Sequence, residues 1–253
     1  MVPPSWQLQT PLDAIIFDCD GTLSAIEGID HLAEQNGAGD SVKQLTALAM
    51  GTTGLNPILY QQRLDLVKPT KEQILALAQD YFQHQSEDAA AVIQLFSRLK
   101  KKIYIISAGL YPSVVKFAEL LGVSSENVFA VNVEFDQQGV YSHFDKTSPL
   151  SEVHGKKTIV TQLKNSNPSI AFVGDGLNDY SAYDLVTRFI GYGGAYYREN
   201  IAALCQFYIT SISMAPLLPL TLTESEHDVL LPNEKILYSK GLELIRVGKV
   251  KVS

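Results

Sequence analysis

Short apolar runs that end in small or polar residues recur along this chain and restrict its fold more than any other feature. The runs are LDAIIF at 12–17, which leads into DCDGT, then IYIIS at 103–107, SIAFVG at 169–174 and FIGYG near residue 189. Helical patterns separate them, at about 87–100, 112–121 and 156–164, and from GDGLND at 174–179 to about 187. This alternation predicts parallel strands joined by helices, which is a doubly wound α/β fold.

The alternation is interrupted once. Residues from about 27 to 84 show helical patterns separated by Gly, Asp, Pro and Thr, and they predict a small helical insert. At 131–144, alternation on both sides of a Gln138-Gly139 turn predicts a β-hairpin. We expect an α/β core at 1–24 and 86–218, a helical cap at 25–85, and a C-terminal extension at 219–253. That extension could hold a short helix and a basic end.

Composition excludes several classes of partner. The 20 basic and 27 acidic residues give a net charge of −7, and no basic cluster exceeds Lys100–Lys102, so we expect no nucleic acid ligand. Cys19 and Cys205 are too few for a disulfide framework and lack zinc-site spacing. The first ten residues contain no basic residue, and no apolar run approaches the roughly 20 residues that a membrane span needs. We therefore expect a cytoplasmic monomer or homodimer that does not bind membranes.

Polar side chains gather where the predicted strands end. Asp18 and Asp20 follow the first strand, Ser107 ends the second, and Asp175 with Asp179 follows a later one. Because ligands of open α/β sheets bind at the carboxyl ends of the strands, these residues should converge although they are distant in sequence. Lys156, at the start of a predicted helix, belongs to the same set.

Such a set suits phosphoryl transfer. Three gathered carboxylates repel one another unless a cation neutralises them, and all-oxygen ligation favours Mg²⁺. The charge on a transferred phosphoryl group could be stabilised by Mg²⁺, by Lys156 and by the Ser107 hydroxyl with the backbone N–H groups that follow it. One carboxylate could attack phosphorus while another passes the proton.

Four fragments carry a resemblance to a known family. FDCDGT at 17–22, ISAG at 106–109, Lys156 and GDGLND at 174–179 resemble, in this order, the four motifs of the haloacid dehalogenase superfamily. The resemblance implies a Rossmann-like core with a mainly parallel sheet, a small helical cap inserted after the first motif, and a magnesium-dependent phosphomonoesterase. It extends to the phosphoserine phosphatase family through EGID at 27–30, AMG at 49–51, RLDLV at 63–67, NVFA at 127–130 and IGYGG at 190–194.

The narrower resemblance covers the chain to about residue 213 and implies roles for individual residues. Asp18 would be the nucleophile and form an aspartyl-phosphate, and Asp20 would act as acid and then as base. Mg²⁺ would be held by Asp18, Asp175 and the Asp20 backbone carbonyl, with Asp179 just outside its ligands.

The remaining implied roles concern the substrate. Ser107, Ala108 and Lys156 would bind the phosphate, Glu27 the substrate ammonium and Arg63 its carboxylate, while Met50, Gly51 and Asn178 would line or border the pocket. The implied reaction is hydrolysis of L-phosphoserine to L-serine and phosphate in serine biosynthesis. The charges of Glu27 and Arg63 support this substrate independently of the resemblance, because an amino acid phosphate needs one anionic and one cationic partner beyond the phosphate site.

Two departures from the family leave alternatives open. Asn56 stands where that family usually has Phe, and Ser107-Ala108-Gly109 replaces the usual Ser-Gly-Gly, with Leu110 where an aromatic residue is common. A different small phosphate monoester, or phosphoryl transfer to an alcohol, would keep the same chemistry. A non-catalytic binding protein on this fold is a further alternative, which the presence of both aspartates of DCDGT disfavours.

Overall fold

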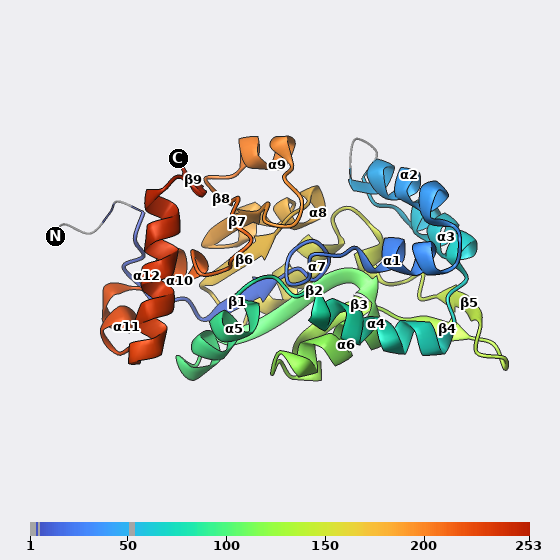
Figure 1. Cartoon of the computed structure of the whole chain (residues 1–253), viewed down its shortest axis with the longest axis horizontal. Helices are drawn as coiled ribbons and strands as arrows, with labels where there is room; N and C mark the ends of the chain where they lie inside the picture. The colour runs from blue at the N-terminus through green and yellow to red at the C-terminus, as the bar shows by residue number, and fades with distance from the viewer. Residues whose placement is uncertain (1–3, 5, 51–53) are drawn as a thin grey trace.

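The structure is a computed structural model that describes residues 4, 6–50 and 54–253. Within that part of the chain, seven strands form one sheet of order β3-β2-β1-β6-β7-β8-β9 (Figure 1). The strands are β1 Ala14–Phe17, β2 Lys102–Leu110, β3 Val128–Val131, β6 Ile170–Gly174, β7 Arg188–Tyr192, β8 Phe207–Ile209 and β9 Val250–Val252. All neighbouring pairs are parallel except β8 with β9. The mainly parallel α/β fold is confirmed.

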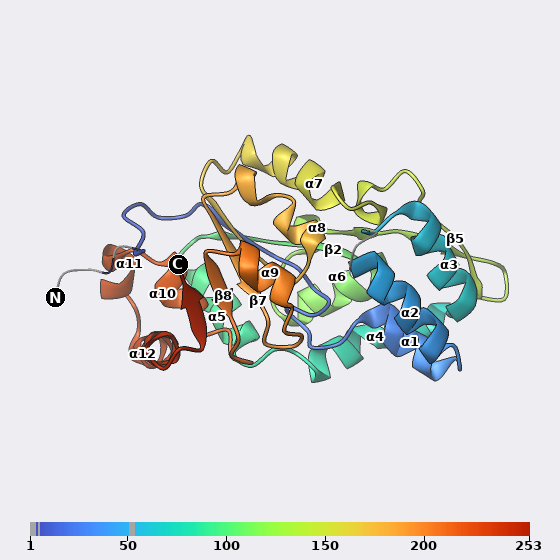
Figure 2. The ribbon, with the colours of Figure 1, turned by 90° about the horizontal axis from the view of Figure 1, so that it is seen from above.

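Parallel strands need crossover connections, and helices supply them in this fold. β1 and β6, at the centre of the sheet, are buried along their whole length, which explains why their sequences are continuous apolar runs. The connecting helices, which flank the sheet in Figures 1 and 2, are α5 Ala89–Arg98, α6 Tyr111–Leu120, α7 Gly155–Lys164, α8 Leu177–Tyr180 and α9 Glu199–Leu204. The positions of α5, α6 and α7 agree with the periodicity of the sequence, whereas α9 was not predicted.

One helix is shorter than predicted. The helix expected to run from GDGLND to about 187 ends at Tyr180, and a separate 3-10 turn covers Tyr183–Leu185. The Ser181 hydroxyl donates a hydrogen bond of 2.7 Å to the carbonyl of Asn178. Such local side-chain bonds compete with the helical backbone ladder, so the α-helix stops after one turn.

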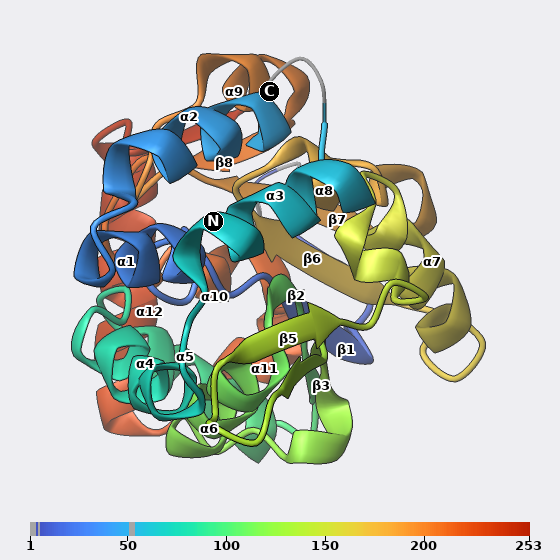
Figure 3. The ribbon, with the colours of Figure 1, turned by 90° about the vertical axis from the view of Figure 1, so that its right-hand side faces the viewer.

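Between residues 28 and 83, the regular elements that the structure describes are all helical, as predicted. They are α1 Gly28–Gln35, α2 Gly39–Met50, α3 Pro57–Val67 and α4 Lys71–Gln83, called here the helical insert. Asn56 caps α3, and Thr70 with Gln73 forms a capping box on α4. In Figure 1, α1, α2 and α3 lie at the right-hand end, and Figure 3 views them from that end, in front of the strands.

The predicted hairpin contacts the helical insert through backbone hydrogen bonds. Its strands, β4 Val133–Phe135 and β5 Tyr141–Phe144, are antiparallel. The carboxylate of Asp136 accepts two backbone hydrogen bonds across the turn, which confirms the hairpin. The Tyr141 N–H donates to the carbonyl of Pro69, and Gly139 accepts from the Lys71 N–H. These backbone bonds attach the start of α4 to the hairpin, while the body of α4 packs on α6.

The C-terminal extension contains more regular structure than the one short helix that the sequence suggested. It contains α11 Glu224–Asp228, α12 Pro232–Arg246 and β9, and α10 Leu217–Thr221 crosses its expected start at residue 219. In Figures 1 and 2, α11 and α12 lie at the end of the molecule opposite α2 and α3. β9 pairs with β8 and covers an edge that would otherwise present unpaired backbone groups. Among the described residues, no helix has the length and apolar character to cross a bilayer.

Candidate active site

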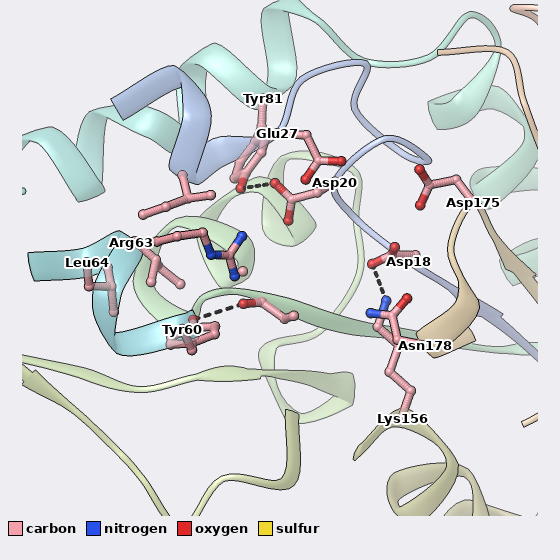
Figure 4. Close-up of a pocket in the computed structure, with 14 residues that line it drawn as sticks. Asp18, Asp20, Glu27, Tyr60, Arg63, Leu64, Tyr81, Lys156, Asp175 and Asn178 are labelled. Carbon is pink, nitrogen blue, oxygen red and sulfur yellow. Dashed lines mark hydrogen bonds and ion pairs between the residues drawn. The ribbon is translucent and has the colours of Figure 1, made fainter. Parts of the chain in front are cut away.

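The polar residues predicted to converge lie around one pocket at the carboxyl edge of the sheet (Figure 4). Asp18 and Asp20 follow β1, Asp175 follows β6, and Lys156 lies in the first turn of α7. Ser107, near the end of β2, reaches the same place through a hydrogen bond to Asp20. The three strands are neighbours in the sheet, so their ends bring these side chains together.

A buried lysine links two of the aspartates. The Lys156 Nζ lies 2.6 Å from Oδ1 of Asp18 and 2.6 Å from Oδ1 of Asp179. Burial lowers the pKa of Lys156, but the carboxylates of Asp179 and Asp18 raise it by more, so the net shift is upward. Burial raises the pKa of Asp18, Asp179 raises it further, and Lys156 opposes both. The ammonium group therefore remains charged and compensates the adjacent carboxylates.

Three carboxylates offer a place for a hard cation. Asp18, Asp175 and Asp179 are buried, and each has an oxygen within 4.8 Å of the others. Burial is the main reason that the pKa of Asp175 rises to about 6, with Arg198 lowering it and Asp179 raising it. Buried carboxylate oxygens held this close favour a divalent cation with oxygen ligands, and Mg²⁺ fits that donor set.

The carboxyl group of Asp20 points away from this trio, towards the helical insert. Its Oδ1 accepts hydrogen bonds of 2.6 Å from the Gly28 N–H and 2.7 Å from the Tyr81 hydroxyl. Its Oδ2 accepts one of 3.2 Å from the Ser107 hydroxyl. Ser107 Oγ in turn accepts from the Gly109 N–H at 2.9 Å. Asp20 is thus available for proton transfer, separate from the carboxylates that could hold a metal ion.

The far wall of the pocket comes from the helical insert. Glu27, Ile29, Tyr60, Arg63, Leu64 and Tyr81 line it, opposite Ala108, Gly109, Leu110 and Asn178. Figure 4 shows the Arg63 guanidinium and the Glu27 carboxylate pointing into the same space as Asp20. The polypeptide therefore places one cation and one anion from the insert around the aspartates of the core.

Arg63 is a buried cation with few partners. The residue is 4% exposed, and its Nη1 lies 3.5 Å from the Thr46 hydroxyl. Among the described residues, its Nε has no hydrogen-bond partner. A buried charge is costly unless it is paired, so this guanidinium favours an anionic ligand in the pocket.

Arg198 is a site residue that the sequence analysis missed. Its Nε and Nη2 lie 3.0 Å and 2.8 Å from Oδ2 of Asp175, and Nη2 lies 3.4 Å from Oε1 of Glu27. Burial raises the pKa of Glu27, as do Asp175 and Asp20, whereas Arg198 lowers it. Arg198 belongs to no motif, but it lies in the loop after β7, which is part of the same sheet edge. Its position after a predicted strand is the feature of the sequence that could have indicated a residue of this site.

The remaining residues that the sequence analysis named differ in whether the structure places them at the pocket. Asn178 borders the pocket, and its Oδ1 accepts a hydrogen bond of 3.0 Å from the Asp179 N–H. Gly51 and the side chain of Met50 lie outside the described residues. Asn56 accepts hydrogen bonds from the Ile58 and Leu59 N–H groups and is not among the residues that line the described pocket. Its substitution for Phe therefore supplies a helix cap.

Comparison with known proteins gives four related findings. The family model described as haloacid dehalogenase-like hydrolase matches residues 12–183. Bovine phosphoserine phosphatase is 34% identical over 200 residues, which are 78% of this chain and 89% of the relative. The chloroplastic phosphoserine phosphatase of Arabidopsis thaliana is 34% identical over 206 residues, covering 78% of this chain and 68% of the relative. A phosphoserine phosphohydrolase-like protein from Francisella tularensis has a TM-score of 0.72 at 25% identity, over 79% of this chain and 96% of that one.

Proposed function

The chain belongs to the haloacid dehalogenase-like hydrolase family, and from this membership we propose that it is a magnesium-dependent phosphomonoesterase that hydrolyses L-phosphoserine to L-serine and phosphate. The observation that most directly supports this substrate is the buried Arg63 guanidinium, which shares one pocket with Glu27 and Asp18. The curated relatives named phosphoserine phosphatase support the same substrate.

The reaction needs a nucleophile and a proton donor on one side of the pocket. A carboxylate oxygen of Asp18 attacks phosphorus, and the bond from phosphorus to the serine oxygen breaks as Asp20 gives that oxygen its proton. Asp20 then takes a proton from water, whose oxygen attacks the phosphorus of the aspartyl-phosphate. Phosphate leaves, and the Asp18 carboxylate and the protonated Asp20 are restored.

The charge of the phosphoryl group needs compensation throughout. Lys156, the Ser107 hydroxyl and the Ala108 backbone N–H would bind its oxygens. Asp18, Asp175 and the Asp20 carbonyl would hold Mg²⁺, which supplies positive charge to the transferring group when bound. Asp179, whose Oδ1 accepts a hydrogen bond of 2.6 Å from Lys156, would orient that lysine and stay outside the ligands of the ion.

The insert would select the amino acid. The Arg63 guanidinium can bind a carboxylate with two parallel hydrogen bonds, and Glu27 can accept from an ammonium group. Arg198, which contacts both Glu27 and Asp175, would hold Glu27 beside the metal ligands. Asn178 would complete the wall of the pocket. We further propose a cytoplasmic monomer or homodimer that acts in serine biosynthesis.

A panel of phosphate esters with Mg²⁺ tests the substrate. Phosphoserine should be hydrolysed with the highest kcat/KM, ahead of phosphothreonine, phosphoethanolamine and sugar phosphates. Replacing Arg63 with Met should lower kcat/KM for phosphoserine by roughly 10²-fold or more, since truncating one partner of a buried charge pair costs about 2–5 kcal/mol. The same variant should lose little with phosphoethanolamine, which has no carboxylate. Arg246→Met, at an exposed arginine of α12, is the matched control.

Two outcomes would contradict the proposed substrate. One is a preference for phosphoethanolamine or a neutral sugar phosphate in the wild-type protein. The other is an equal loss on every ester in the Arg63 variant. Phosphoryl transfer to added alcohols in preference to water would replace hydrolysis by a phosphotransferase activity.

A further inference from the structure

The two carboxyl oxygens of Asp20 have different surroundings. Oδ1 accepts two short hydrogen bonds, from the Gly28 N–H and the Tyr81 hydroxyl, and both donors belong to the helical insert. Oδ2 accepts one longer bond from Ser107, on the core side. A Cβ built on Gly109 would lie 2.8 Å from Oδ2, so a side chain there would occupy the space beside this oxygen. The glycine keeps that side of Asp20 open.

The position of the Tyr81 hydroxyl is tightly constrained. Tyr81 is 1% exposed and lies on α4, where its ring packs against Phe117 of α6 at 5.5 Å between centroids. A Cβ built on Gly28 would lie 2.0 Å from this hydroxyl, so only glycine leaves room for it. The hydroxyl is therefore placed by packing on both sides, and Asp20 must adopt the orientation that accepts from it.

We propose that Tyr81 is a positioning residue which, together with the Gly28 N–H, occupies Oδ1 of Asp20 and directs Oδ2 towards the leaving group of the substrate. A carboxyl oxygen has about two lone-pair sites, and two donors already use those of Oδ1. In the acid form of Asp20, the proton consequently resides on Oδ2. This inference rests on the proposed function, because it assigns the oxygen that carries out the proton transfer.

The step assigned to Oδ2 is balanced. As Asp18 bonds to phosphorus, the phosphorus–oxygen ester bond breaks, and its electron pair stays on the serine oxygen. The proton on Oδ2 moves to that oxygen, which leaves Asp20 as a carboxylate. In the second half-reaction, Oδ2 accepts a proton from the attacking water. Tyr81 keeps its own proton throughout and contacts Asp20 without contacting the reacting atoms.

The test is Tyr81→Phe, which removes the hydroxyl and keeps the ring. Phosphoserine releases an alkoxide that needs a proton, whereas p-nitrophenyl phosphate releases a phenolate that leaves without one. The two first-turnover rates, for serine and for p-nitrophenolate, are measured by rapid mixing at saturating substrate. We expect the first turnover of phosphoserine to slow by about tenfold or more, since general acid catalysis contributes roughly 10²–10⁴-fold and only its alignment is lost. The p-nitrophenolate burst should stay close to the wild-type rate, and KM for phosphoserine should not change.

The matched control is Tyr192→Phe. Tyr192 is equally buried, and its hydroxyl donates at 2.7 Å to the carbonyl of Ile212, away from the pocket. Its loss should leave the ratio of the two first-turnover rates unchanged. An equal fall of both rates in Tyr81→Phe would show a packing role, and no fall in either would show that the hydroxyl is dispensable. Both results overturn the proposal.

Failure of the proposed substrate would look different. The wild-type protein would then release p-nitrophenolate but no serine. In that case the alkyl ester that the substrate panel identifies replaces phosphoserine in the same comparison, and the assignment of Tyr81 is judged on that pair of esters.

Discussion

The ion pair between Lys101 and Glu226 fastens the C-terminal extension to the core, and its removal should be costly. The Lys101 Nζ lies 2.5 Å from Oε1 of Glu226, with the two side chains 2% and 13% exposed. The same ammonium also donates to the carbonyl of Leu12 at 3.1 Å. Glu226 closes a capping box with Thr223 at the start of α11. Glu226→Gln removes the charge and one of two acceptor oxygens, because Oε1 accepts from Lys101 and Oε2 from the Thr223 N–H, whereas glutamine offers a single oxygen.

The magnitude follows from the burial of Lys101. Removing one partner of a buried pair costs about 3–5 kcal/mol, because the other charge is left without compensation. Glu226 is partly exposed and glutamine still accepts a hydrogen bond, so we expect the lower value, about 3 kcal/mol. For a domain of this size, 1 kcal/mol shifts Tm by roughly 2–4 °C, so Tm should fall by about 6–12 °C.

Urea and thermal unfolding of three variants test this reasoning. Glu224→Gln, at an exposed position on the same helix, should change stability by less than about 0.5 kcal/mol. A Lys101→Met, Glu226→Leu double variant removes both charges and should recover much of the loss, since apolar replacement of buried pairs is often neutral. The reasoning is refuted if Glu226→Gln is as stable as Glu224→Gln, or if the double variant is less stable than Glu226→Gln.

Three further predictions concern the chemistry. Asp18→Asn should abolish turnover of every phosphate ester and leave the far-UV circular dichroism spectrum unchanged. Retained activity would contradict the role of Asp18 as the nucleophile. Chelation with EDTA should abolish activity and excess Mg²⁺ should restore it. Added Mg²⁺ should also raise the Tm of the wild-type protein, because a ligand that binds only the folded state stabilises it. The same addition should leave the Tm of Asp175→Asn nearly unchanged, and an equal rise in both proteins would place the ion elsewhere.

The sequence by itself determined four neighbouring strands of the sheet and the residues at their carboxyl ends, but it did not predict β3, β8 or β9. The apolar runs that became β1, β2, β6 and β7 have the length and composition of buried strands, and the helical patterns between them supply the crossover connections that parallel pairing requires. Parallel strands end on one side of a sheet, so Asp18, Ser107 and Asp175 had to meet there. Patterns of local sequence were sufficient because each depends on residues close together in the chain.

Only the tertiary structure decided which residues complete the pocket. Tyr81 reaches Asp20 across 61 positions of sequence, and Arg198 reaches Glu27 across 171. Neither belongs to a motif, because their placement depends on how α4 packs on α6 and where the loop after β7 turns. The structure of the C-terminal extension was only partly predicted, for the same physical reason. The sequence of β9 carries no sign of its partner, and pairing with β8 and the buried contact of Lys101 with Glu226 arise only once the sheet has formed.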